Sequence, residues 1–180
     1  MSFNNLKEIE DLDTINEKIK LLETMKLKYE SPDPNVKYDC TNNIKSKGFT
    51  KLMKLCMMTN KYPNLHKHIN KLIKDKSEKI NAQNNKGFSA LMLASINFNK
   101  CSSIETIQLL LENKVDINAR NNKGWSSLML AAQYSNIETV RLLLENKADI
   151  NARNNGKSSL MLAVEYSNIE TVQLLLENKA

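Results

Sequence analysis

The chain has 180 residues, of which 41% are hydrophobic and 26% charged, with a formal net charge of +6. This composition is typical of a folded protein, and no apolar run approaches the ~18 residues that a membrane helix needs. The acidic N-terminus, MSFNNLKEIEDLD, lacks the apolar stretch of a secretory signal. Because Cys40, Cys56 and Cys101 form no CxxC pair, we expect a reducing compartment, the cytoplasm or the nucleus.

Residues 1–34 are predicted to form a helical cap at the N-terminus. Apolar residues recur there every three or four positions, as on one face of a helix, and the prolines at positions 32 and 34 end the pattern. The apolar face would cover the folded unit that follows. The alternative is a separate helix for partner binding or dimerisation.

Residues 35–79 contain most of the basic charge, since 45–79 has ten lysines and only two acidic residues. Three of these lysines fall on one predicted helix: Lys67, Lys71 and Lys74. Such a row is a solvated face, a site for an acidic protein or a site for nucleic acid. Arginine, which pairs best with phosphate and bases, is absent there. We interpret 35–79 as a degenerate copy of the repeat described next, lengthened around 59–64.

Residues 80–180 repeat one sequence three times. INAQNNKGFSALMLA begins at residue 80, INARNNKGWSSLMLAA at 117 and INARNNGKSSLMLAV at 150. A period near 33 residues is typical of a solenoid, in which each unit buries its apolar face only by stacking on its neighbours. The predicted units are 80–116, which contains an insertion, 117–149 and 150–180.

Each unit is predicted to contain a turn, a short helix and a longer amphipathic helix. In 117–149 the Asn-rich run closed by Gly124 has turn chemistry, and Ser126 stands where a helix N-cap is expected. We interpret Asn136 as a left-handed cap that ends the short helix. The longer helix has an apolar face formed by Ile137, Val140, Leu143 and Leu144, and a polar face formed by Glu138, Arg141 and Glu145.

The pattern G-x-S-S-L-M-L-A-A-x-x-S-N-I-E-T-V-x-L-L-L-E-N-K-A-D-I-N-A resembles the ankyrin repeat, densely over 80–180 and less clearly over 44–79. The resemblance implies an all-α solenoid of stacked helix-turn-helix units with short β-hairpin fingers. The Asn- and Lys-rich style is similar to the ankyrin arrays of giant DNA viruses and AT-rich protists. For a viral protein the expected compartment is the host cytoplasm.

The sequence departs from the ankyrin pattern in several places. The Pro and His of the family's T-P-L-H segment are absent, with Met in place of His. The Gly that usually ends the second helix is Lys114, Lys147 or Lys179, at a cost of up to about 1 kcal/mol each. The last unit is one residue short between Asn151 and Gly156, so its fingertip should be tighter.

The last unit also copies the apolar residues of an internal unit, and no further unit follows it in these 180 residues. This bare end indicates a fragment of a longer array, a contact surface or a frayed end. We expect a monomer unless the bare face mediates self-association.

No catalytic, cofactor or metal site is predicted. The sequence contains no GxGxxG, P-loop, HExxH or Gly-x-Ser-x-Gly motif. Its only histidines, His66 and His68, are two residues apart, so they would point to different sides of a helix and make a poor metal pair. Cys56 is predicted to be a small core residue.

The resemblance implies a partner surface on the concave face formed by the fingers and the first helices. Residues at the fingertips and on the first helices differ between units while the framework barely changes, and aromatic residues and Arg dominate binding energy. The predicted partner-binding residues are Phe49, Phe88, Arg120, Lys123, Trp125, Gln133, Tyr134, Arg153, Lys157 and Tyr166. The alternative is that Phe88 and Trp125 pack only against neighbouring fingers.

The sequence therefore predicts a non-enzymatic scaffold that binds another protein, without a cofactor. Two alternatives remain open. One is polyanion or nucleic-acid binding through 45–79. The other is a substrate adaptor for a ubiquitin ligase, as the resemblance to viral ankyrin proteins implies, although their C-terminal recruiting domain is not found in these 180 residues.

Overall fold

The computed structural model describes residues 48–60, 63–76, 79–96, 102–134, 136–166 and 168–180. They form successive pairs of helices: α3 (Lys51–Cys56) with α4 (Leu65–Lys74), α5 (Ala90–Ile96) with α6 (Ile104–Glu112), α7 (Ser127–Gln133) with α8 (Ile137–Glu145), and α9 (Ser159–Glu165) with α10 (Ile169–Glu177). The predicted cap over 1–34 lies outside the described residues. The predicted unit boundaries stay predictions.

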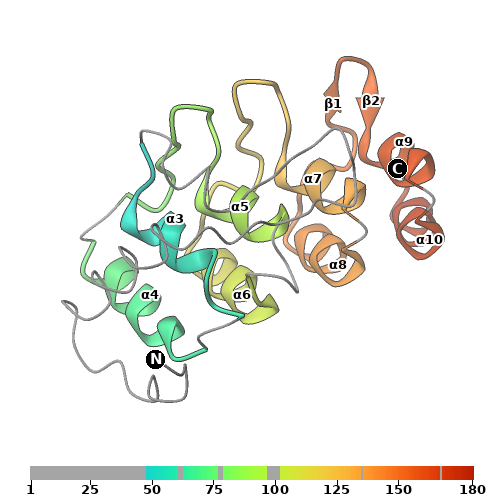
Figure 1. Cartoon of the computed structure of the whole chain (residues 1–180). Helices are drawn as coiled ribbons and strands as arrows, with labels where there is room; N and C mark the ends of the chain where they lie inside the picture. Colours follow the sequence, from blue (N-terminus) through green and yellow to red (C-terminus); the bar gives the residue numbers. More distant parts are fainter. Residues whose placement is uncertain (1–47, 61–62, 77–78, 97–101, 135, 167) are drawn as a thin grey trace, which may run out of the picture. The chain divides into compact units, whose positions relative to one another are not determined.

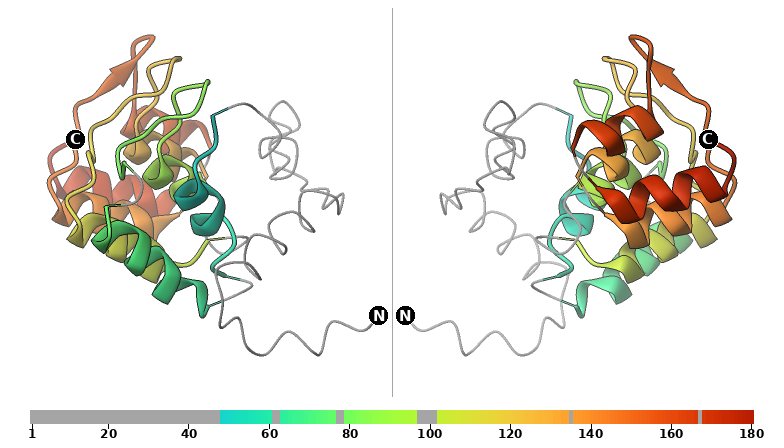
Figure 2. Two further views of the ribbon diagram at one scale, coloured as in Figure 1. Left: turned by 90° about the vertical axis from the view of Figure 1, so that its left-hand side faces the viewer. Right: turned by 90° about the vertical axis from the view of Figure 1, so that its right-hand side faces the viewer.

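The helix pairs of Gly48–Ala180 stack in chain order. The first helices α3, α5, α7 and α9 lie side by side, and the second helices α4, α6, α8 and α10 form an adjoining layer (Figure 1). Figure 2 shows the finger loops projecting beyond the first helices, on the side away from the second helices. The expected helical solenoid with small hairpins is confirmed.

The first helices begin at hydroxyl N-caps. The hydroxyl oxygen of Ser126 accepts a hydrogen bond from the backbone N–H of Met129, and that of Ser158 accepts one from Met161, each at 3.3 Å. Thr50 caps α3 in the same way. An N-cap satisfies one of the free N–H groups of the first turn, which is why such short helices start at a fixed residue. The N-cap prediction for Ser126 is confirmed.

Asn136 begins α8, so the prediction that it ends the preceding helix in a left-handed conformation is wrong. Its φ is −102°, and its side-chain oxygen accepts a hydrogen bond from Thr139 N at 3.1 Å. Asn168 caps α10 through Thr171 N. The free N–H groups of the longer helix lie next to this side chain, and they decide its role.

The second helices are amphipathic as predicted. Val140 and Leu143 are fully buried, whereas Glu138, Arg141 and Glu145 are exposed. Below the fingers, the core between neighbouring pairs is filled by the methionines that replace the family's His: Met53, Met92 and Met129. Met fills irregular gaps without needing a hydrogen-bond partner. Cys56 is also buried, as predicted.

Lysines end the second helices in a left-handed conformation. The φ angles of Lys114, Lys147 and Lys179 are 57°, 65° and 66°. The residue after Lys147, Ala148, donates its N–H to the carbonyl oxygen of Leu143 at 2.9 Å, as in a Schellman motif. Lysine therefore occupies the left-handed position at the end of the second helix, where the ankyrin pattern usually has a glycine.

The finger of the last unit is a tight β-hairpin. Strand β1 (Arg153–Asn154) pairs with β2 (Lys157–Ser158) in antiparallel register, with Asn154 opposite Lys157. The two intervening residues, Asn155 and Gly156, have φ angles of 49° and 81°, as a type I′ turn requires. The prediction of a tighter fingertip is confirmed.

The two preceding fingers are held by a buried asparagine. The side-chain oxygen of Asn121 accepts hydrogen bonds from the backbone N–H groups of Lys123 and Trp125, at 2.9 and 3.0 Å. Asn84 makes the equivalent bonds one unit earlier. The asparagine side chain thus satisfies two backbone N–H groups of each loop, and a backbone bond from Asn121 N to Trp125 O at 3.0 Å also closes the finger.

Neighbouring fingers also contact one another. The backbone N–H of Asn122 donates to the carbonyl oxygen of Lys86 at 3.1 Å, and its side-chain amide donates to Asn85 O at 2.9 Å. A Cβ atom placed on Gly87 would lie 2.5 Å from the backbone nitrogen of Asn122, so no side chain fits there. In the last finger, a Cβ on Gly156 would meet no described atom within 4 Å.

Replacement of these two glycines tests the finger contact. Both have a positive φ, so we expect Gly156→Ala to lower the free energy of unfolding by about 1 kcal/mol. Gly87→Ala adds the overlap with Asn122 and should lower it by about 2–4 kcal/mol. Urea unfolding followed by circular dichroism measures both values. Equal losses would show that the fingers do not pack as described.

Candidate partner-binding surface

The aromatic residues that follow the finger glycines are buried or partly buried. Trp125 is partly buried and packs against a cluster of Met129, Ala152 and Leu162. Phe88 is only 7% exposed. The surface proposed below therefore omits Phe88, although the sequence placed it among the partner-binding residues. Phe49, in the first described finger, is partly buried.

The finger arginines tie the fingers together and remain exposed. Arg120 Nη1 donates to the carbonyl oxygen of Arg153 in the next finger at 2.7 Å. Arg153 Nη1 donates to Gly156 O at 3.4 Å within its own finger. One terminal nitrogen of each guanidinium makes these bonds, so the remaining N–H groups face solvent.

Four polar side chains meet at the ends of α7 and α9. Gln133 donates its amide N–H to the hydroxyl oxygen of Tyr166 at 2.9 Å. Lys157 forms an ion pair with Glu165 at 2.6 Å, and the hydrogen bond to Glu165 raises the pKa of Lys157 above its usual value. Both residues of this pair are exposed. Tyr134 ends α7 at the position that Tyr166 occupies in the next unit.

The sequence analysis did not include Glu165 among the site residues. Its partner Lys157 is the first residue of strand β2, and Glu165 is the last residue of helix α9, eight positions later. Because the two residues lie in different elements, no regular helix or strand spacing in the sequence indicates that they pair. The exposed or half-exposed residues that share this face are Lys123, Gln133, Tyr134, Arg153, Lys157, Glu165 and Tyr166.

A separate polar network joins two units near the second helices. His66 Nε2 lies 3.0 Å from the hydroxyl oxygens of both Ser103 and Thr106. Thr106 donates its own proton to Thr59 Oγ1 at 2.6 Å, and Thr59 donates to Cys56 O. The sequence analysis predicted no role for His66, because its partners come from another unit.

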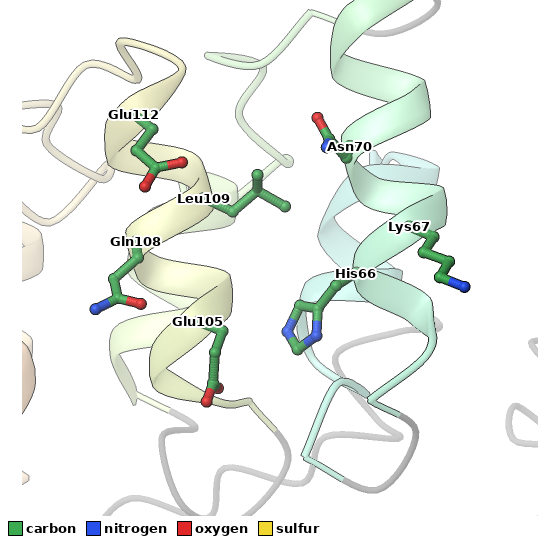
Figure 3. A pocket seen from close by; sticks show the side chains of 7 residues that line it. All are labelled: His66, Lys67, Asn70, Glu105, Gln108, Leu109 and Glu112. Carbon is green, nitrogen blue, oxygen red and sulfur yellow. The ribbon is translucent and has the colours of Figure 1, made fainter.

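An open groove of about 400 Å³ lies between α4 and α6, beside this network. The His66 ring and the Leu109 side chain point into the space between the two helices (Figure 3). The groove is lined by His66, Lys67, Asn70, Glu105, Gln108, Leu109 and Glu112. The backbone N–H of Glu105 and the Ser103 hydroxyl hold the pKa of the Glu105 carboxyl below its usual value of 4.5, with the nearby His66 adding to the effect.

No group of three or more His, Cys, Asp or Glu side chains that could hold a metal occurs in the described part of the chain. Within the same residues, no helix is long and apolar enough to cross a membrane. What the finger face offers is hydrogen bonding, charge and aromatic area for contact with another molecule.

The last unit exposes apolar residues whose counterparts are buried in internal units. Met161 is 48% exposed, whereas Met129 at the equivalent position is 0% exposed. Val164 is 59% exposed, whereas Ala132 is 0% exposed. Met129 is covered by the finger and first helix of the next unit, and no described residue covers Met161 in this way. The bare face that the sequence indicated is therefore present.

Comparison with known proteins identifies the repeat. Residues 98–180 match the family model described as ankyrin repeats in three copies. Residues 98–180 are therefore similar to ankyrin repeats. As a family, ankyrin repeats generally mediate protein–protein interaction and are generally not enzymes.

Similar proteins occur in Acanthamoeba polyphaga mimivirus. The chain is 44% identical over 84 residues to the putative ankyrin repeat protein L91 of Acanthamoeba polyphaga mimivirus, a match that covers 44% of this chain and 13% of the relative. It is 47% identical over 72 residues to the putative ankyrin repeat protein L289 of the same virus, covering 39% and 13%. The expected likeness to giant-virus ankyrin arrays is confirmed. The matched part of this chain spans only about an eighth of these relatives' length.

Equivalent substitutions in an internal unit and in the last unit test the stacking. Met129→Lys places an amine in a closed core, so we expect the free energy of unfolding to fall by about 3 kcal/mol or more. Met161→Lys changes a half-exposed residue and should cost less than about 1 kcal/mol. Chemical denaturation of the two variants gives the comparison. A similar large loss in both would mean that the last face is covered in solution.

The Glu105 carboxyl provides a prediction for pH. A folded-state pKa below the usual 4.5 means that the ionised carboxylate stabilises the fold, and that this stabilisation is lost as the pH falls through the folded pKa. We expect Glu105→Gln to be less stable than the wild type at neutral pH, with the difference shrinking below pH 4.5. Thermal unfolding midpoints measured across this range would test it. A difference that does not depend on pH would contradict the assignment.

Proposed function

We propose that this protein is a non-enzymatic scaffold that binds another protein on the face formed by its fingers and the ends of its first helices. The observation that carries the proposal is the repetition of Tyr134 and Tyr166 at one position of successive repeat units, with Gln133, the chain neighbour of Tyr134, donating to the Tyr166 hydroxyl. A tyrosine offers a large contact area and a hydroxyl with few rotatable bonds, so ordering it on binding costs little entropy.

The rigidity of the face supports this proposal. The fingers are joined to one another through Asn122 and Arg120, and the helix ends through Gln133. Side chains that are already held in place lose little freedom on binding, so more of the contact energy contributes to affinity. The surface comprises Lys123, Gln133, Tyr134, Arg153, Lys157 and Tyr166, with Arg120 and Trp125 mainly supporting it.

We further propose that the protein works in the cytoplasm, that of the host cell if it is viral, and as a monomer. Self-association would use the apolar face of the last unit, where Met161 and Val164 are exposed.

Affinity capture from cytoplasmic lysate tests the proposed surface. The wild type is compared with a Gln133→Ala, Tyr134→Ala, Tyr166→Ala variant, and captured proteins are quantified by mass spectrometry. The three side chains lie at helix ends and are not fully buried, so we expect the variant to stay folded and to lose the captured partner about tenfold or more.

The control is a variant of the second-helix face, Glu138→Ala, Arg141→Ala, Gln173→Ala, whose three residues are exposed. It should capture the partner as well as the wild type does. Equal capture by all three proteins would reject the finger face. If that equal capture were also lost by ~0.3 M salt, the binding site would move to the Lys-rich segment 45–79.

A further inference from the structure

The fingertips of successive units present only positive charge. The tip segments 83–88, 120–125 and 153–157 contain five basic residues and no acidic one: Lys86, Arg120, Lys123, Arg153 and Lys157. All five are exposed. The whole chain has nearly as many acidic residues, 20, as basic ones, 26. A surface with only basic residues is therefore a local concentration of positive charge and not a reflection of the overall composition.

The acidic residues closest to the fingers are already engaged. Asp116 and Asp149 stand at the finger bases, where their side-chain oxygens accept hydrogen bonds from Asn118 N and Asn151 N. Glu165 pairs with Lys157. Within the described part of the chain, the other four fingertip cations have no carboxylate partner.

Stacking holds these cations close to one another. Lys86 and Lys123 belong to adjacent tips, and the carbonyl oxygen of Lys86 accepts a hydrogen bond from the residue just before Lys123. Arg120 contacts the backbone of Arg153 directly. Like charges at such positions repel and destabilise the fold modestly. An anionic partner that crosses the tips would relieve this repulsion.

The arginines keep the donors that a carboxylate needs. A guanidinium has five N–H donors in a planar fork that matches a carboxylate in a bidentate geometry. Arg120 and Arg153 each use Nη1 for finger carbonyl oxygens. The other donors of both side chains lie on the exposed side of the fingers.

We infer that the protein partner is acidic and that an acidic segment of it lies across the three fingertips, with its carboxylates on Lys86, Lys123 and the two arginines. The inference rests on the function proposed above and gives the chemistry of the partner segment that would contact the fingertip part of that surface. The outer faces of α6, α8 and α10 would attract such a segment less, because six of their exposed residues are glutamates: Glu105, Glu112, Glu138, Glu145, Glu170 and Glu177.

Fluorescence anisotropy with a labelled peptide of alternating Glu and Ser tests the inference. We expect the peptide to bind the full chain in about 0.05 M salt and a Gln-Ser peptide not to bind. A Lys86→Gln, Lys123→Gln, Arg153→Gln variant should raise the Kd about tenfold, since each exposed ion pair contributes a factor of a few. Arg120 is left intact because it bonds to the neighbouring finger.

The matched control removes the same charge from outside the fingertips through Arg141→Gln, Lys147→Gln and Lys179→Gln, all at exposed positions. It should change the Kd by less than about twofold, because these cations lie outside the fingertips. Thermal unfolding of both variants verifies that each is folded. Equal weakening by the two variants, or no binding of the Glu-Ser peptide, would overturn the inference.

Two further results separate this inference from the proposed function. Tighter, fingertip-dependent binding of an oligothymidylate than of the Glu-Ser peptide would overturn the acidic-protein partner in favour of nucleic acid. Lysate capture that depends on Tyr134 and Tyr166 but not on the fingertip cations would leave the proposed function standing and reject the acidic partner.

Discussion

The covering of each unit's apolar face by the next unit is the constraint on which this structure depends. The helices have six to ten residues, a length at which an isolated helix is barely stable in water. Their stability comes instead from neighbours, as when Met129 is covered by Ala152 and Leu162 of the following unit. Met161, at the equivalent position of the last unit, is exposed because no described residue covers it in this way.

Stacking also creates the surface that we assign to binding. It brings the fingers so close that Gly87 has no room for a side chain beside Asn122. Side chains at equivalent positions of successive units then line up, and their charges line up with them. The finger face therefore has a charge pattern that no single unit has, and a partner would contact several units at once.

The second-helix side of the array is joined differently. Thr59 belongs to the insertion around 59–64 and bonds to Thr106, while His66 bonds to Ser103 and Thr106. Ser103 stands where later units have a capping asparagine, and its side chain makes no cap bond to its own helix. Hydroxyl and imidazole groups thus connect two units at a point where later units cap their own helices.

Periodicity and local chemistry in the sequence were enough to determine the helical array, the serine N-caps, the left-handed lysines and the tight turn at Asn155. Each of these depends on residues a few positions apart, so the local backbone decides it. The prediction for Asn136 was wrong because this residue stands between the end of α7 and the start of α8, where an asparagine can cap either helix. Only the tertiary structure decided that Phe88 is buried, that Arg120 bonds to the next finger, that Lys157 pairs with Glu165 and that His66 joins Thr106. These contacts join groups from different units or from separate elements of one unit, and their geometry exists only after the units have stacked.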